Sequence, residues 1–363
     1  MTAALDAPSP RAGWRARMLR LAASPVFQSW AARFPLTRPL VRREGEAIFD
    51  LVAGFVHAQA LSALVELDLP AAAVEAPVTA EHGAPAGIAP ERMEVLLEAG
   101  VALGLLRREG AGGWRATVRG AALAGVPGLR DMIRHHRALY ADLADPLMLL
   151  RGGTAELAAF WPYVFGGEAP PAEARRYSAL MADSLGPVAE EALDALDLSG
   201  VRHLMDVGGG TGAFLCHAAR RTDAALTLFD LPAVVPAARE RFRDHGVEAR
   251  IVPGSFRDGP LPDGADAISL VRVLYDHDDA TVSDLLRKCR AALPEGGRLV
   301  VAEPMRGCRA GDGYFAFYCM AMGTGRVRAP AEIARLLRVA GFRATRERRT
   351  RRPFVTSVVE ARA

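Results

Sequence analysis

The chain has 363 residues, of which 50% are hydrophobic and 24% are charged, with a formal net charge of +3. These values predict a globular protein with a large core and two domains, and they exclude a fibrous or disordered chain. No uninterrupted apolar run approaches the roughly 18 residues needed to cross a bilayer, and the first residues lack a secretory-signal layout, so we expect a cytoplasmic protein.

Lysine, cysteine and histidine usage restricts the kinds of site that can be expected. Lys288 is the single lysine among 45 basic residues, so arginine clusters reflect a compositional bias and are weak evidence of binding. The four cysteines show no CxxC pairing, which indicates reduced thiols rather than a zinc site. His135 and His136 are adjacent on a predicted helix and do not converge on one ion, so we predict no metal site.

Residues 7–43 combine arginines with aromatic side chains and contain no acidic residue. The arginines are interleaved with Trp14, Phe27, Trp30 and Phe34. Basic helices with aromatic anchors bind anionic membrane surfaces. A dimerisation arm has the same pattern, so the segment predicts either peripheral membrane contact at the inner face of a membrane or contact with a partner subunit.

Two helical patterns follow, at 48–67 and 90–106, and then a polar hairpin at 107–123. This order is typical of a winged helix, a module that often binds DNA, and a transcription regulator is therefore the non-enzymatic alternative. The helix that would enter the groove carries Glu91, Glu94 and Glu98 against Arg92. Its negative charge would repel phosphates, so we predict a packing or dimerisation module and no nucleic-acid partner.

Residues 128–198 are predicted to be mainly helical, and a change in composition near residue 200 marks the expected boundary between domains 1–200 and 201–363. Beyond it, helical segments alternate with strand-like runs, which predicts a parallel sheet with helices on both faces. The runs lie at 203–208, 226–230, 248–254, 266–274 and 298–304. Two further runs, 341–350 and 351–363, have no helix between them and predict a terminal antiparallel hairpin at the sheet edge. The fold class is therefore α/β, with a mostly parallel seven-stranded sheet.

The segment DVGGGTGAF, residues 206–214, follows the first of these strands. Gly208, Gly210 and Gly212 allow a tight turn and close approach to a nucleotide, and the same spacing also fits a dinucleotide site. Asp206 favours a cationic ligand over a pyrophosphate, and Asp230, at the end of the next strand, can accept ribose hydroxyls. With the terminal hairpin, these features favour S-adenosylmethionine over NAD. A tight packing turn and a helix cap at Asp230 are the structural alternatives.

The motifs LMDVGGGTG, LFDLP, PGSF, LVRVLYDHDDA and AALPEGGRLVVAEP occur in this order along the chain. In this arrangement the chain resembles the S-adenosylmethionine-dependent small-molecule O-methyltransferases of the caffeic-acid and chalcone type, from about residue 48 onward. The segments SPVFQSWAARFPLTRPLVRREG and FAFYCMAMGTGR look most like the bacterial hydroxyneurosporene (demethylspheroidene) O-methyltransferases. The resemblance implies a Rossmann-like donor domain, an N-terminal winged-helix-like domain for dimerisation that also acts as a substrate lid, and a homodimer.

The resemblance also implies roles for individual residues. Ser255 replaces the acidic residue of the family's adenine motif, while Phe256 can still stack on the base. The implied donor site comprises Asp206, Gly208, Gly210, Gly212, Asp230, Leu231, Gly254, Ser255, Phe256 and Arg272. Met181 matches a methionine that packs on substrate, and Phe317 and Met320 belong to an apolar stretch that would line a long channel for a hydrophobic substrate.

The catalytic segment departs from the family pattern, because Tyr275 stands where the family has its histidine base. Asp276 is retained, His277 replaces a tryptophan, Glu303 matches the carboxylate that orients the base, and a second acidic position falls on Val327. Loss of the histidine fits an alcohol substrate whose reaction depends on positioning. Tyr275 would orient the hydroxyl, with Glu303 or His277 as the acceptor of charge or proton.

Three functions remain open at this point. The first is methylation of the tertiary 1-hydroxyl of an acyclic carotenoid. The second is methylation of another small molecule, at a tetrapyrrole carbon or at a polyketide or phenol oxygen. The third is a binding or regulatory protein without activity, which the intact donor motifs disfavour.

Overall fold

The computed structural model describes residues 10–160 and 181–363, which form two compact units that divide between Ala121 and Ala122. Residues 7–9 of the basic segment and 161–180 of the predicted helical stretch lie outside this description. The observed division differs from the boundary expected near residue 200. The reason is packing. Helix α10 (Gly186–Ala195) lies against strands β7 (Arg298–Glu303) and β9 (Ser357–Arg362), so this helix belongs to the same unit as the sheet.

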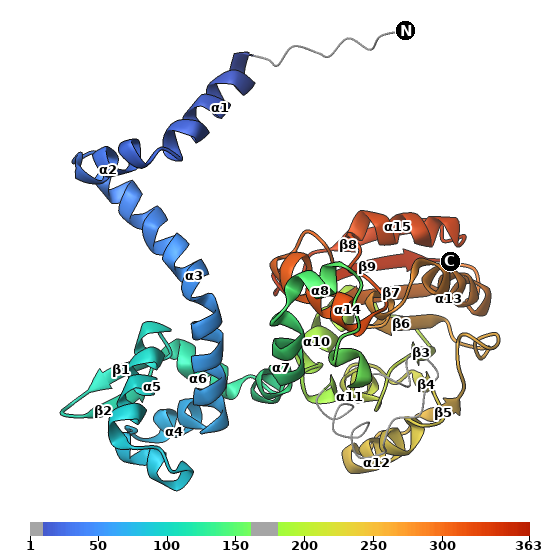
Figure 1. Cartoon of the computed structure of the whole chain (residues 1–363). Coiled ribbons are helices and arrows are strands. Elements are labelled where there is room, and N and C mark those ends of the chain that lie inside the picture. Colours follow the sequence, from blue (N-terminus) through green and yellow to red (C-terminus); the bar gives the residue numbers. More distant parts are fainter. Residues whose placement is uncertain (1–9, 161–180) are drawn as a thin grey trace. The chain divides into compact units, whose positions relative to one another are not determined.

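The first unit contains helices and one short hairpin (Figure 1). Its elements are α1 (Pro10–Ala22), α2 (Pro25–Arg33), α3 (Arg38–Glu66), α4 (Leu69–Glu75), η1 (Ala80–Ala86), α5 (Pro90–Ala102), β1 (Leu106–Glu109) and β2 (Gly113–Ala116). The predicted hairpin is confirmed up to residue 116, since β1 and β2 pair antiparallel, but residues 118–123 lie in helix α6 (Val118–Gly125). Glu98 on α5 accepts hydrogen bonds from Arg108 and Trp114, so one of the acidic residues on this helix holds the hairpin in place.

Helix α3 is apolar and largely exposed within its unit. It has 29 residues, its best window has a mean hydropathy of 1.7, and 11% of that window is buried. By length and composition alone this helix could cross a membrane, although the sequence shows no uninterrupted apolar run of that length. The apolar stretch is interrupted because Asp50, His57 and Gln59 lie within it.

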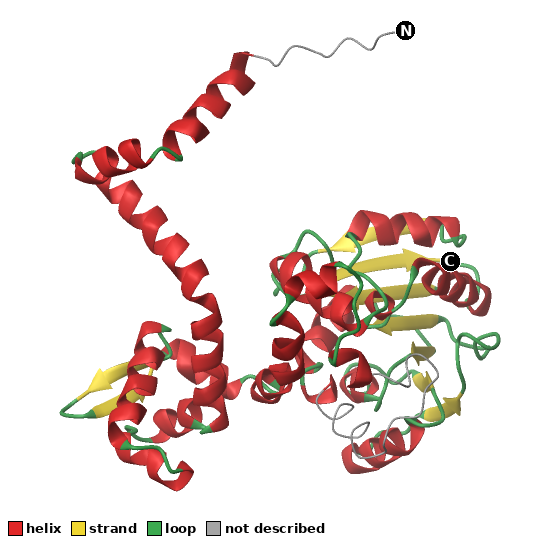
Figure 2. Ribbon diagram, viewed as in Figure 1, coloured by secondary structure: helices red, strands yellow, loops and turns green. Residues whose placement is uncertain are grey.

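The second unit is built on a seven-stranded sheet with the order β5-β4-β3-β6-β7-β9-β8, seen as yellow arrows in Figure 2. Its strands are β3 (His203–Val207), β4 (Ala225–Asp230), β5 (Arg250–Pro253), β6 (Ala267–Val271), β7, β8 (Ala344–Arg348) and β9. The first five pair in parallel, while β9 pairs antiparallel with both β7 and β8. The predicted sheet and terminal hairpin are therefore confirmed.

Helices cover both faces of this sheet because the central strands are apolar on both sides. One face packs on α10, α11 (Ala213–Ala218) and α12 (Val235–His245), with Phe214 and Phe242 in the core. The other face packs on α13 (Asp279–Ala292) and α15 (Pro330–Val339). The remaining described elements are α6 (Val118–Gly125), α7 (Leu129–Leu143), α8 (Pro146–Leu150), η2 (Leu157–Phe160), η4 (Leu274–Asp276), η5 (Ala310–Phe315) and α14 (Ala316–Met322).

Candidate active site

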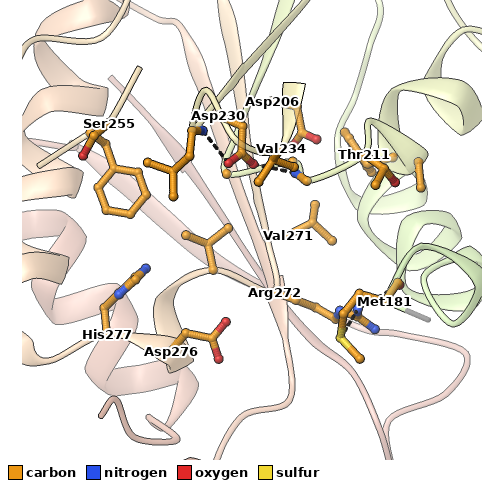
Figure 3. Close-up of a pocket in the computed structure, with 18 of the residues that line it drawn as sticks. Met181, Asp206, Thr211, Asp230, Val234, Ser255, Val271, Arg272, Asp276 and His277 are labelled. Atoms are coloured by element: carbon orange, nitrogen blue, oxygen red, sulfur yellow. Dashed lines mark hydrogen bonds between the residues drawn. The ribbon is translucent and has the colours of Figure 1, made fainter. Parts of the chain in front are cut away.

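A cavity of about 370 Å³ lies at the carboxyl ends of strands β3 to β6 in the second unit. Loops that leave neighbouring parallel strands meet at one edge of a sheet, and this is where such folds bind ligands. The structure brings together most of the predicted site residues in its wall: Met181, Asp206, Gly208, Gly210, Asp230, Leu231, Gly254, Ser255, Phe256, Arg272, Tyr275 and His277. Figure 3 shows how the labelled members face the same space.

Three buried polar atoms in this wall have no hydrogen-bond partner within the described chain: Asp206 Oδ2, Thr211 Oγ1 and Asp276 Oδ1. Buried acceptors of this kind need a donor from a ligand or from water. S-adenosylmethionine offers an ammonium, two ribose hydroxyls and a sulfonium charge, so the residues present fit this group. The carboxylates would repel a pyrophosphate.

The glycine turn and Asp230 form one hydrogen-bonded unit. The N–H of Gly210 donates to Asp230 Oδ2 at 2.6 Å, and the N–H of Leu231 donates to Oδ1 at the same distance. Burial raises the pKa of Asp230, and burial raises that of Asp206 to about 7 although the Ser269 hydroxyl donates to it. Each oxygen of Asp230 still has a free lone pair, which leaves capacity for ribose hydroxyls.

Gly212 is the glycine of the motif that does not line the cavity. It caps α11 with φ 76°, and a Cβ there would come within 2.4 Å of the Phe242 ring. Its role is therefore close packing between the turn and α12, and the expectation that it contacts the donor is not supported. The sequence could not separate these roles, because both require glycine.

The catalytic segment begins where β6 ends, earlier than predicted. Arg272 has a left-handed backbone with φ 58°, which stops the strand at Val271. Its guanidinium donates to Ser184 Oγ at 3.1 Å and to the carbonyl of Met181 at 2.9 Å. The 3₁₀ turn η4 then takes the place of a continued strand. In a strand, the side chains of residues 275 and 277 would point to the same side, and the turn removes this expectation.

His277 is poorly suited to accept a proton. A guanidinium N–H of Arg257 donates to Nδ1 at 3.1 Å, and a neutral ring then carries its proton on Nε2. Burial, with the charge of Arg257, lowers the pKa of His277 to about 4. The ring lies edge-on to Phe256, with centroids 5.3 Å apart, on the side of Ser255 in Figure 3. His277 is therefore placed beside the predicted adenine contact.

Tyr275 lines the cavity, whereas Glu303 lies behind the turn. Burial first, and then the neighbouring Asp276 carboxylate, raises the pKa of Tyr275 well above its ordinary value, so its hydroxyl is protonated. Glu303 Oε2 accepts the N–H groups of Leu274 at 2.9 Å and Tyr275 at 3.2 Å. Glu303 is not among the residues that line the cavity, and it holds the segment through these two N–H groups, while its Oε1 has no partner in the described chain.

Two residues that hold this segment were missed by sequence reasoning. Arg328 is fully buried and donates to the carbonyls of Leu274 and His277, each at 2.8 Å. Gly325 packs so closely that a Cβ there would lie 2.1 Å from the carbonyl oxygen of Tyr275. Both lie in the GTGRVRAP segment. Arginine is so abundant in this chain that the sequence alone does not distinguish Arg328 from the other arginines. Val327 packs with Tyr275 and Cys319 in a small core cluster.

The apolar side chains predicted to contact substrate occupy a different face of α14. Neither Phe317 nor Met320 lines the cavity, and Met320 is 38% exposed. Instead, Phe315 and Tyr318 pack toward Tyr275 and the neighbouring core. Residues 315, 318, 319 and 322 follow the helical repeat of one buried face, which leaves positions 317 and 320 on the other. The apolar composition of the stretch does not show which of its residues fall on the buried face of the helix.

A row of aromatic rings leads away from Tyr275. Its ring meets Phe315 with centroids 5.8 Å apart, Phe315 meets Tyr314 at 4.8 Å, and Tyr314 meets His136 on α7 at 5.4 Å. His136 Nε2 and the Tyr314 hydroxyl lie 2.7 Å apart, and burial lowers the pKa of His136 to about 4. The two histidines of this helix therefore meet tyrosine side chains, His136 at Tyr314 and His135 at Tyr318.

Comparisons with known proteins agree with this geometry. Residues 140–343 match the family model described as O-methyltransferase domain. The chain is 54% identical to a demethylspheroidene O-methyltransferase of Cereibacter sphaeroides, over 94% of this chain and 93% of that protein. It is 49% identical to the protein of that name from Rhodobacter capsulatus, over 94% and 88%. Among solved structures, human N-acetylserotonin methyltransferase in complex with S-adenosylmethionine superposes with a TM-score of 0.74 at 25% identity, over 88% and 97% of the two chains.

Proposed function

Because the chain belongs to the O-methyltransferase family, we propose that it methylates the tertiary 1-hydroxyl of an acyclic carotenoid of the hydroxyneurosporene or demethylspheroidene type. It is an enzyme of this class with S-adenosylmethionine as methyl donor. Support for the substrate comes from the two bacterial relatives of that name and from the departure at Tyr275, which removes the base that a phenol would use.

The observation that carries the proposal is Tyr275, an aromatic ring in the wall of the donor cavity at the position of the family's histidine base. A conjugated polyene is long, flat and apolar, and aromatic faces pack well against such a chain. The end of the polyene that bears the hydroxyl would then lie at Tyr275, beside the donor cavity. Asp206, Asp230 and Phe256 would hold the donor, with Leu231, Gly254 and Ser255 around its adenosine and Met181 and Arg272 toward the reacting end.

Tyr275 is proposed to orient the substrate hydroxyl by hydrogen bonding. Its protonated phenol can donate to the alcohol oxygen, which keeps one lone pair directed at the methyl group. Most of the rate would then come from alignment of oxygen, methyl and sulfur, an effect of up to about 7–11 kcal/mol.

We expect transfer of isotopically labelled methyl from S-adenosylmethionine to detergent-dispersed 1-hydroxy acyclic carotenoids, and little transfer to a catechol or a flavonoid phenol. In the same assay, Tyr275→Phe should lower kcat/KM for the alcohol about tenfold, the effect of one hydrogen bond. Label found in the phenols alone would overturn the proposed substrate. Turnover unchanged in Tyr275→Phe would overturn the proposed role of the hydroxyl.

Two exposed surfaces of the first unit suggest partners. On α3, the apolar side chains of Phe49, Leu51, Val52 and Phe55 are each more than half exposed, which is typical of an interaction site. We propose that a second copy of the chain covers this face, giving a homodimer. On α1, Trp14 is 63% exposed beside exposed arginines, and we propose that this helix docks a cytoplasmic enzyme on an anionic membrane, where a carotenoid dissolves.

The two surfaces are expected to respond to different substitutions. Removing the charges of α1 in Arg15→Gln/Arg17→Gln/Arg20→Gln should reduce flotation with anionic vesicles, since each charge contributes about 1 kcal/mol to such binding, and leave the dimer intact. In contrast, Leu51→Asp/Phe55→Asp on α3 should give monomers by sedimentation equilibrium while α1 still binds vesicles. Unchanged vesicle binding by the α1 variant would contradict the proposed membrane contact. A dimer in the α3 variant would contradict the proposed dimer interface.

A further inference from the structure

Four carboxylates line the donor cavity: Asp258 is exposed, and the other three, Asp206, Asp230 and Asp276, differ in their surroundings. Both oxygens of Asp230 accept backbone N–H groups. The Oδ2 atom of Asp206 lies under the glycine turn, where a Cβ on Gly209 would come within 2.0 Å of it. Asp276 is 8% exposed, its Oδ1 has no partner in the described chain, and Figure 3 shows its carboxylate between His277 and Arg272, across the cavity from Asp230. Asp276 therefore has an acceptor atom available within the cavity.

The backbone around Asp276 is fixed from several sides. Its N–H donates to the carbonyl of Val273 at 3.3 Å, and its carbonyl accepts the Thr324 hydroxyl at 3.0 Å. Glu303 holds the two preceding N–H groups, Arg328 holds the carbonyls on either side, and Gly325 packs against the chain. The backbone that carries Asp276, and with it the direction of its Cα–Cβ bond, is thus fixed without a ligand, which favours a preorganised acceptor.

We propose that Asp276 is the catalytic residue that accepts the hydroxyl proton of the substrate, after forming an ion pair with the sulfonium of the methyl donor. This inference rests on the proposed function. The alcohol O–H bond breaks and the O–CH₃ bond forms as the S–CH₃ bond breaks. The electron pair of the S–CH₃ bond stays on sulfur, and the proton moves to Asp276 Oδ1. The sulfonium charge and the carboxylate charge vanish together, so the cavity carries the same net charge before and after transfer.

The groups that face Asp276 agree with this role. Burial, and then the Glu303 carboxylate on β7, raises the pKa of Asp276 well above its ordinary value, while Arg272 at the end of β6 lowers it. Tyr275, Cys319 and His277 are further titratable neighbours: burial raises the pKa of the first two and lowers that of His277 to about 4. A carboxylate with a raised pKa is a better base, and a cation in the cavity favours its ionised form.

Binding of the methyl donor should therefore release protons from Asp276, and the number released should depend on the charge of the ligand. S-adenosylmethionine and S-adenosylhomocysteine share the ammonium and the ribose but differ in the sulfonium charge. Below the raised pKa of the free protein, the cationic ligand drives ionisation and the neutral one does not. Well above that pKa the carboxylate is already ionised, so the difference disappears.

The experiment is isothermal titration calorimetry of the full chain with each ligand in buffers of different ionisation enthalpy, as a function of pH. We expect wild type to release more protons with S-adenosylmethionine, by up to about one per subunit. Asp276→Asn should remove this difference, whereas Asp206→Asn should keep it because both ligands carry the ammonium that Asp206 would meet. Equal release of protons by wild type with both ligands overturns the proposal.

Turnover supplies a second readout. Asp276→Asn keeps the shape of the side chain but loses its basicity, so kcat should fall by about 100-fold, with the dissociation constant of S-adenosylhomocysteine nearly unchanged. Full turnover by Asp276→Asn would also overturn the proposal. If the carotenoid is not the substrate, the methyl-transfer assay fails but the difference in proton release between the two ligands persists. This difference is measured without an acceptor substrate, so the two failures can be told apart.

Discussion

Gly325→Ala is expected to lower kcat/KM by at least about 100-fold, the cost of displacing a reacting group by about 1 Å. The added Cβ would lie 2.1 Å from the Tyr275 carbonyl oxygen and 2.5 Å from the Asp276 carbonyl carbon. Both contacts are with backbone, so rotation of a side chain cannot relieve them. The segment that carries Tyr275 and Asp276 must move instead.

Gly323→Ala is the matched control for this effect. Gly323 and Gly325 have left-handed backbones, with φ 79° and 74°, in the same loop after α14, but a Cβ at Gly323 would meet nothing within 4 Å. Alanine at position 323 should therefore cost about 1–2 kcal/mol of stability from its backbone conformation alone, with kcat/KM nearly unchanged. Steady-state kinetics and thermal unfolding of the two variants separate strain from displacement. Equal loss of activity in both would show that the loop conformation, and not the contact with the segment, matters.

Arg328→Met is expected to have the largest effect on folding stability. The substitution leaves the carbonyls of Leu274 and His277 buried without their donor, and each such loss costs about 1–3 kcal/mol. We therefore expect the free energy of unfolding to fall by about 3–5 kcal/mol, measured by urea denaturation. Binding of S-adenosylmethionine should weaken as well, because Leu274 and His277 flank the cavity residues Tyr275 and Asp276.

Arg326→Met serves as the comparison for Arg328→Met. Arg326 binds Asp279, as Arg328 does, and also Glu332, but its side chain is 39% exposed. Such exposed ion pairs contribute about 1 kcal/mol or less, so this variant should unfold close to wild type. If both variants lost the same stability, the ion pair with Asp279 would be responsible and the two carbonyls would not.

The sequence predicted the sheet and the donor loops well because their signals are local. The seven strand-like runs, the DVGGGTGAF turn and Asp230 each depend on a few neighbouring residues. By contrast, Arg328 contacts Leu274 across 54 positions, and no local pattern marks such a pair. The early end of β6 depends on the left-handed backbone of Arg272, a conformation that an arginine side chain does not signal.

The chemistry of the catalytic segment is less evident from the sequence than the sheet. Residue type and position make Glu303 and His277 candidates for the base, but Glu303 lies outside the cavity wall and the Nδ1 atom of His277 accepts a hydrogen bond from Arg257. Asp276 was noted only as retained, since an aspartate in a charged segment has no distinguishing local feature. The role proposed for it rests on burial, on an unpartnered oxygen and on a place in the cavity wall, which only the fold reveals.

The strand order also bears on how the protein is made. β7 pairs on one side with β6, and its other edge stays open until β9 is synthesised, because β8 attaches only through β9. A nascent chain that has passed Glu303 but not Ser357 therefore presents an unpaired strand edge next to the apolar side chains of Leu299 and Val301. Such edges pair readily with other chains. Pauses of the ribosome between these positions would favour aggregation, so this interval is where a chaperone would be needed most.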